Sequence, residues 1–312
     1  MATPPGVAKA LQRVQAQVDA GAFYEAQQMY KTTYHRYHSR RQLEEAYAVL
    51  REGAVQQLRS GQITCGAELG TMLVEAFGDD KAPPAGGAVD ALCAVVAAMP
   101  APPAGAPEEG ADADVDACSR FITAAVKWAH KAGADAGVRR LHDLFAGHLI
   151  SAYGWRLLGR ASAHFARGGD ADAFAAALAG CAAAAPAGEA DLFVARAVLQ
   201  TLACAHPATL GRQLAHADAL LAACRRRAWG GGPLPDTPLL HFAGFLLTAL
   251  QQRSHALVQL LRVKYAPALA RDPSLEAYLA RAEEVYFNVG GGAGGGLLGG
   301  LLRGLFEGDE EE

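Results

Sequence analysis

An amphipathic helix is predicted by the stretch Gly21-Ala-Phe-Tyr-Glu-Ala-Gln-Gln-Met-Tyr-Lys-Thr-Thr-Tyr-His-Arg-Tyr37. Its aromatic residues follow helical spacing and stack on one face: Phe23, Tyr30, Tyr34 and Tyr37. Basic residues crowd the same segment: Lys31, Arg36, Arg40 and Arg41. We expect the aromatic stripe to belong mostly to the core, whereas the cationic side is either solvated or a docking face.

The same helical period returns at a fixed interval. Apolar residues open successive amphipathic segments at Phe23, Leu43 and Ile63. Two such helices form a hairpin of about 40 residues, close to the unit length of helical repeat arrays. Because a single hairpin leaves an apolar face exposed, the hairpins have to stack. We therefore predict an all-α fold, a right-handed α-solenoid of stacked TPR-like helical hairpins with about 14 helices and a flexible C-terminal tail.

The apolar periodicity continues along most of the chain. After a first stripe from Val7 to Val18 and the three segments above, it marks Val89–Met99, Val115–Trp128, Val138–Leu149, Trp155–Phe165, Phe174–Cys181, Leu192–Leu202, Leu210–Cys224, Leu239–Leu250, Leu257–Tyr265 and Leu275–Phe287. We assign residues 5–150 to the N-terminal half of the solenoid, 151–289 to its C-terminal half and 290–312 to a Gly-rich, acidic, flexible tail.

Composition and apolar run length limit the possible partners and the location of the protein. Apolar residues make up 51% of the 312 residues but aromatics only 7%, because alanine carries much of the apolar count. The net charge of −4 argues against nucleic acid as the main partner. The longest apolar run, Leu239–Leu250, is too short to cross a bilayer, and the N-terminus carries no signal-peptide pattern. We expect a cytosolic protein without direct membrane insertion.

The sequence contains no recognisable catalytic or metal-binding motif. The six cysteines are scattered without a Cys-x-x-Cys pair, so reduced and mostly buried thiols are expected. Asp112–Asp116 lacks the glycine and glutamate of a calcium loop, and His35 with His38 has no further metal ligands nearby. Arg225–Arg227 is explained by the negative end of a helix. We predict neither catalysis, nor a cofactor, nor a metal.

Two segments in the second half stand out. The loop Gly230–Pro238 is rich in Pro and Gly and is long enough to do more than connect helices. At the C-terminus, a glycine spacer is followed by apolar residues at helical spacing: Leu297, Leu298, Leu301, Leu302, Leu305 and Phe306. They belong either to a frayed tail or to a short amphipathic segment that folds on a partner.

Several islands of sequence resemble one known family. They include Gly21–Tyr37, Gly53-Ala54, Gly66–Leu69, Asp191–Gln200, Pro238–Phe242, Phe245–Leu247, Arg271–Pro273 and Gly295–Gly299, in unchanged order. The chain resembles the Golgi-to-ER traffic protein four family, the α-solenoid adaptor of the guided-entry pathway for tail-anchored membrane proteins. The resemblance implies a non-enzymatic cytosolic adaptor that links the targeting ATPase to a ubiquitin-like or BAG-domain scaffold protein. Through that partner it receives a co-chaperone loaded with a client.

The resemblance also implies two sets of contact residues. ATPase-binding positions are Lys31, where the family commonly has arginine, Arg36, Glu68, where aspartate is usual, and Gln27. The family has histidine where this chain has Gln27, so whether Gln27 contacts the ATPase stays open. Partner-binding positions are Pro233, Leu234 and Pro235 in the loop, and Leu239, Phe242 and Phe245 on the following helix, with the two phenylalanines as apolar anchors.

Two other functions compete with this reading. A generic TPR-like scaffold or peptide-binding module in another chaperone or complex-assembly pathway has the same helical pattern. A helical hydrolase or metal enzyme would need an acid, base and nucleophile in one constellation, which the motifs do not supply. The identity of the ubiquitin-like or scaffold partner stays open, as do the stoichiometry of the assembly and the role of the Leu-rich tail.

Overall fold

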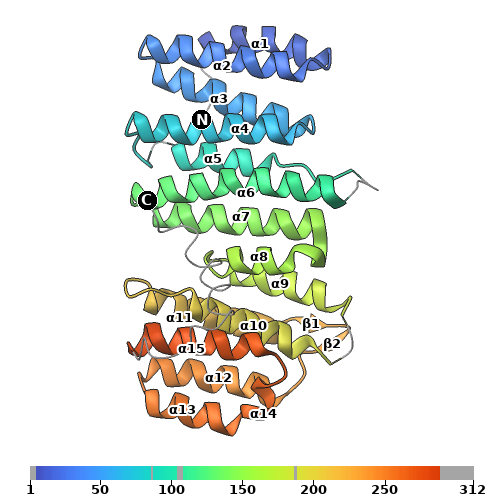
Figure 1. Ribbon diagram of the computed structural model, residues 1–312, viewed down its shortest axis with the longest axis vertical. Coiled ribbons are helices and arrows are strands. Elements are labelled where there is room, and N and C mark those ends of the chain that lie inside the picture. The colour runs from blue at the N-terminus through green and yellow to red at the C-terminus, as the bar shows by residue number, and fades with distance from the viewer. Residues whose placement is uncertain (1–4, 86, 104–107, 186–187, 289–312) are drawn as a thin grey trace. The chain divides into compact units, whose positions relative to one another are not determined.

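The computed structural model describes residues 5–85, 87–103, 108–185 and 188–288. Its contacts divide the chain after Tyr153 into two compact units. Both consist almost entirely of helices in the parts described (Figure 1), so the predicted all-α fold of stacked helical hairpins is confirmed. No helix in these ranges combines the length and the apolar character needed to cross a bilayer. The tail predicted at 290–312 lies outside the described residues.

The first unit contains seven helices in its described part. They are α1 (Pro5–Asp19), α2 (Phe23–Ser39), α3 (Leu43–Arg59), α4 (Ile63–Asp79), α5 (Ala88–Ala97), α6 (Glu108–Lys131) and α7 (Asp135–Tyr153). The openings predicted at Phe23, Leu43 and Ile63 are confirmed, and each of these helices is 17 residues long. Figure 1 shows consecutive helices lying side by side through this unit.

A repeated turn sets the 20-residue interval. Gly21, Arg41, Gly61 and Lys81 all have positive φ angles, between 52° and 76°. After each of them a backbone N–H reaches five residues back to a helix carbonyl, for example from Gln62 to Gln57 at 2.9 Å. This left-handed turn closes a helix and satisfies its last carbonyls. Two of the four positions therefore hold non-glycine residues in a conformation that favours glycine.

Close packing of α2 on α3 depends on a helical glycine. The Tyr30 ring of α2 is buried against Gly53 of α3, where a Cβ atom would lie 2.7 Å from the ring. Burial also raises the Tyr30 pKa to about 12. The prediction that the aromatic stripe belongs to the core is confirmed for Tyr30 and Tyr34, which are both buried. This contact fixes the position of α2, whose opposite side faces solvent.

The second unit starts with the 3-10 helix η1 (Gly154–Leu157). Then follow α8 (Leu158–Phe165), α9 (Ala171–Ala182), α10 (Ala190–Ala203), α11 (Leu210–Arg226), strands β1 (Ala228–Trp229) and β2 (Gly232–Pro233), α12 (Pro238–Gln251), α13 (His255–Lys264), α14 (Ala266–Leu269) and α15 (Pro273–Phe287). The sequence missed the two strands, α14 and the 3-10 turn, because each is too short to show a period.

Helix α10 forms the centre of the second unit and packs on α9, α11, α12 and α15. Two ion pairs fasten it to the start of α15. Asp191 is 1% exposed and accepts two hydrogen bonds from Arg271, at 2.6 and 3.1 Å. Arg196 donates to Asp272, which also caps the first turn of α15 through Ser274. A buried carboxylate needs such a partner, and this clamp therefore holds residues 80 positions apart.

Candidate binding surfaces

Gln27, Lys31 and Glu68 meet where α2 passes α4 in the first unit. Glu68 is exposed, whereas Gln27, one of the expected contact residues, is only 2% exposed and offers no surface of its own. The Gln27 amide of α2 donates to Glu68 of α4 at 2.7 Å, and the Lys31 ammonium forms an ion pair with the other oxygen of the same carboxylate. The hydrogen bond from Lys31 is the main influence that holds the pKa of Glu68 below its ordinary value. Glu68 therefore does not stand apart from the cation Lys31, and these residues form one α2–α4 polar bridge.

A second polar bridge joins α2 to the end of α4. His38 contacts both carboxylate oxygens of Asp80 at 3.0 Å, and the Tyr47 hydroxyl of α3 donates to Asp80 at 2.9 Å. Burial and this hydrogen bond raise the pKa of Tyr47. The two bridges span 41 and 42 residues, about one hairpin repeat, because α2 and α4 are alternate helices of the same array. His38 is therefore a structural contact between α2 and the end of α4.

The remaining positive charge of this surface lies beyond the first bridge. Arg36 is exposed, and its guanidinium lies 5.4 Å from the centre of the Tyr37 ring. Arg40 and Arg41 are exposed at the end of α2, and the left-handed Arg41 is part of the turn into α3. Since the Lys31 charge is balanced by Glu68, the basic character of the surface comes mainly from these arginines.

The loop after α11 forms a β-hairpin. Ala228–Trp229 pairs antiparallel with Gly232–Pro233, and Gly230 and Gly231 between them both have positive φ, as a type I′ turn requires. The buried Trp229 indole donates to the Cys224 carbonyl at 2.9 Å and anchors the hairpin on α11. Of the expected contact residues, Pro233 and Pro235 are exposed and Leu234 is half-buried.

Helix α12 places its three expected contact residues differently. Leu239 and Phe242 are both 0% exposed, so neither side chain offers surface to a partner in this conformation. The expectation that Phe242 is a surface anchor is therefore wrong here, because the core-facing side of an all-apolar helix includes it. Phe245 is 52% exposed, and its ring lies 6.5 Å from that of Tyr265. Of the three expected contact residues on α12, Phe245 is the one exposed to a partner.

The basic run Arg225–Arg227 makes specific contacts with Asp172, in addition to lying at the negative end of a helix. Arg226 forms an ion pair with Asp172 of α9 at 3.1 Å, and Arg227 donates to the Asp172 carbonyl at 3.0 Å. These bonds connect the end of α11 and the base of the hairpin to α9. The sequence showed the basic run but not its partner 54 residues away.

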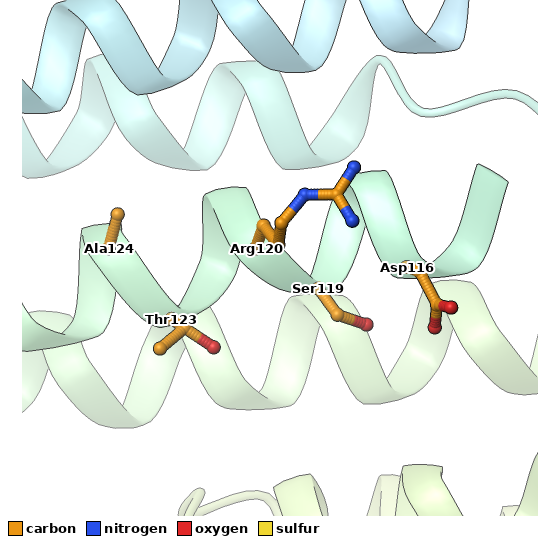
Figure 2. Close-up of a pocket in the computed structure, with 5 residues that line it drawn as sticks. All are labelled: Asp116, Ser119, Arg120, Thr123 and Ala124. Carbon is orange, nitrogen blue, oxygen red and sulfur yellow. The ribbon is translucent and has the colours of Figure 1, made fainter. Parts of the chain in front are cut away.

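An open hollow on α6 was not expected from the sequence. Figure 2 shows that all five labelled lining residues come from this one helix: Asp116, Ser119, Arg120, Thr123 and Ala124. Their spacing is that of a single helix face. Asp116 therefore belongs to a helix and not to a loop. The described residues contain no cluster of three or more metal-ligating side chains.

Comparisons with known proteins give this arrangement a family. A family model described as Golgi to ER traffic protein 4 matches residues 40–306. The chain belongs to this family. It is 29% identical to Protein GET4 of Arabidopsis thaliana over 303 residues, which cover 91% of each chain. It is also 29% identical to the Golgi to ER traffic protein 4 homolog of Bos taurus over 287 residues, covering 91% of this chain and 82% of that one.

The fold agrees with that membership. The crystal structure of C. therm. Get4 matches with a TM-score of 0.71 and 21% sequence identity, covering 96% of both chains. The resemblance stated from the sequence is thus confirmed at the level of family and fold.

Proposed function

We propose that this chain is a non-enzymatic cytosolic adaptor in Golgi-to-ER traffic that acts in the targeting of tail-anchored membrane proteins. It links the targeting ATPase to a ubiquitin-like or BAG-domain scaffold protein, and through that protein to a co-chaperone and its client. The names of its relatives support the traffic role. The finer assignment rests on two exposed surfaces, one on each unit.

The observation that carries this proposal is that each surface is built on a core of its own. In the first unit, α2 is fixed by Tyr30 on Gly53 and presents Arg36 outward. In the second, Trp229 anchors the hairpin, and Phe245 lies exposed on α12. Because each surface is held by contacts within its own unit, each can bind a protein of its own.

The chemistry of the two surfaces differs in a way that suits two partners. Exposed arginines on α2 favour an acidic surface and speed association, an effect that salt screens over about 8 Å. The exposed prolines of the hairpin and the Phe245 ring favour an apolar partner surface, where aromatic anchors supply most of the binding energy. We assign the ATPase to the first surface and the scaffold protein to the second.

Reconstitution with purified proteins tests the assignment. The full chain, the targeting ATPase and the ubiquitin-like scaffold protein are mixed, and the masses of the complexes are measured by size-exclusion chromatography with light scattering. If the chain is an adaptor, the mixture gives a three-component complex, whereas the ATPase and the scaffold protein without the chain stay separate. If the chain binds neither protein, the adaptor proposal is wrong, and the TPR-like module is the competing function to test next.

A further inference from the structure

The outer face of α13 exposes apolar side chains that nothing in the described residues covers. Leu260 is 61% exposed and Val263 is 76% exposed. They lie three residues apart, which places them on one helix face, and the exposed Ala256 extends the same stripe. We call these three residues the α13 stripe.

The other faces of α13 are occupied. Val258 and Leu261 are buried, and α13 packs against α12. On another side, Gln259 and Arg262 donate to Glu283 of α15, at 2.5 and 2.8 Å. Figure 1 labels α13 at the end of the second unit, beyond α12. The last helix of a repeat array usually carries a polar outer face, so an apolar stripe here calls for a cover.

The chain itself supplies a candidate cover close by. Helix α15 ends at Phe287, whose ring lies 5.0 Å from that of His255, the first residue of α13. The residues that follow the described part thus begin at one end of the stripe. They are a Gly-rich spacer, 289–296, and then the apolar segment 297–306.

We propose that the chain's own segment 297–306 binds along the α13 stripe and covers it. In a helix, its six apolar residues fall on one face: Leu297, Leu298, Leu301, Leu302, Leu305 and Phe306. Three glycines within it each weaken an isolated helix by about 1 kcal/mol. Such a segment gains order mainly by burying its apolar face, and the α13 stripe is an exposed apolar surface that begins next to His255, the residue in contact with Phe287.

The dimensions agree with this placement. A flexible eight-residue spacer spans on average about 16 Å. Ten helical residues extend about 15 Å, which applies equally to α13 and to a helical segment 297–306. Because the segment is tethered beside the stripe, its effective concentration is on the order of millimolar, so weak contacts suffice to bind it.

Charge favours one direction of binding. A segment that starts near His255 and runs parallel to α13 brings its acidic end, 307–312, toward the exposed Lys264 next to Val263. The proposal goes beyond the adaptor function and holds whether or not the chain binds the targeting ATPase, since it concerns only this chain.

Photo-crosslinking on the full chain tests the proposal. Benzoylphenylalanine is placed at position 260, and crosslinked peptides are identified by mass spectrometry after separation of monomers from dimers. We expect crosslinks within one chain between position 260 and residues 297–306, reduced at least fivefold in the variant Leu301→Ser with Leu302→Ser. The same probe at position 248, an exposed residue of α12, is the matched control and should give at least fivefold fewer.

Hydrogen exchange gives an independent readout. Removal of residues 297–312 should speed amide exchange of α13 about threefold or more without affecting α2 in the first unit. Crosslinks found only between chains would mean that a second copy covers the stripe, and the proposal would be wrong. Absence of crosslinks to 297–306, with exchange of α13 unchanged by the truncation, would also overturn it.

Discussion

Lys31 of α2 and Glu68 of α4 form an ion pair, and Gln27 donates a second hydrogen bond to the same carboxylate. The Gln27 amide and the Lys31 ammonium thus hold the two oxygens of one carboxylate. The three residues form one bridge, with Gln27 buried beneath it, and the charges of Lys31 and Glu68 largely cancel. Binding by this surface therefore depends mainly on the exposed arginines beside it.

The first prediction concerns the coupling of Lys31 and Glu68. Either single change to alanine removes the ion pair, so the double variant Lys31→Ala with Glu68→Ala should cost less than the sum of the two single changes. The coupling should be about 0.5 kcal/mol, because the pair is partly exposed. Urea denaturation of the four proteins measures it. Fully additive effects would show that the pair contributes nothing in solution.

The second prediction is a pH dependence. Because Lys31 holds the pKa of Glu68 below the ordinary value of 4.5, the stabilisation by ionised Glu68 is fully present above that value and is lost as the pH falls through the lowered pKa. NMR titration that follows the side-chain carboxylate carbon of Glu68 should show a lowered pKa in the wild type and a pKa nearer 4.5 in Lys31→Ala. An identical pKa in both proteins would contradict the bridge.

The third prediction concerns the left-handed turn residue that follows each of the helices α3 and α4. Lys81 has a positive φ of 52°, whereas the equivalent Gly61 has a φ of 76° and no atom within 4 Å of an added Cβ. Lys81→Gly should raise the free energy of unfolding by about 0.5 kcal/mol or more, and Gly61→Lys should lower it by about 1 kcal/mol. Thermal and urea denaturation measure both. A loss of stability in Lys81→Gly would contradict the strain argument.

The fourth prediction compares two phenylalanines on one helix. Phe242 is fully buried, so Phe242→Ala should destabilise the protein by about 3 kcal/mol or more. Phe245 is half exposed, and Phe245→Ala should cost about 0.5 kcal/mol or less while weakening scaffold binding. Denaturation and calorimetric titration of both variants check this. Equal stability losses would contradict the assignment of Phe245 to the surface.

The sequence predicted the helices well because their signal is local. The openings at Phe23, Leu43 and Ile63 follow from apolar periodicity alone, and the buried Tyr30 follows from the aromatic stripe. What it missed depends on contacts between residues far apart. The clamp of Asp191 with Arg271 and the pairing of Glu68 with Lys31 join positions 80 and 37 residues apart, and the apolar pattern does not show which polar side chains meet.

Residue roles on α12 were the hardest to predict for a related reason. The helix is apolar nearly all round, so its sequence does not distinguish the side that packs on α10 from the side that faces solvent. Only the packing shows that Phe242 is in the core and Phe245 is not. The hairpin at Ala228–Pro233 was missed because its strands have two residues each, although Gly230-Gly231 was a signal for it.

Calorimetric titration of two folded variants against both partners tests the two-ended adaptor most directly. Arg36→Glu reverses an exposed charge on α2, and Phe245→Glu places a charge in the apolar surface of α12. The account predicts that Arg36→Glu weakens ATPase binding about tenfold and leaves scaffold binding unchanged, whereas Phe245→Glu weakens only scaffold binding, by a similar factor. Loss of both partners in one variant, or of neither in both variants, would contradict it.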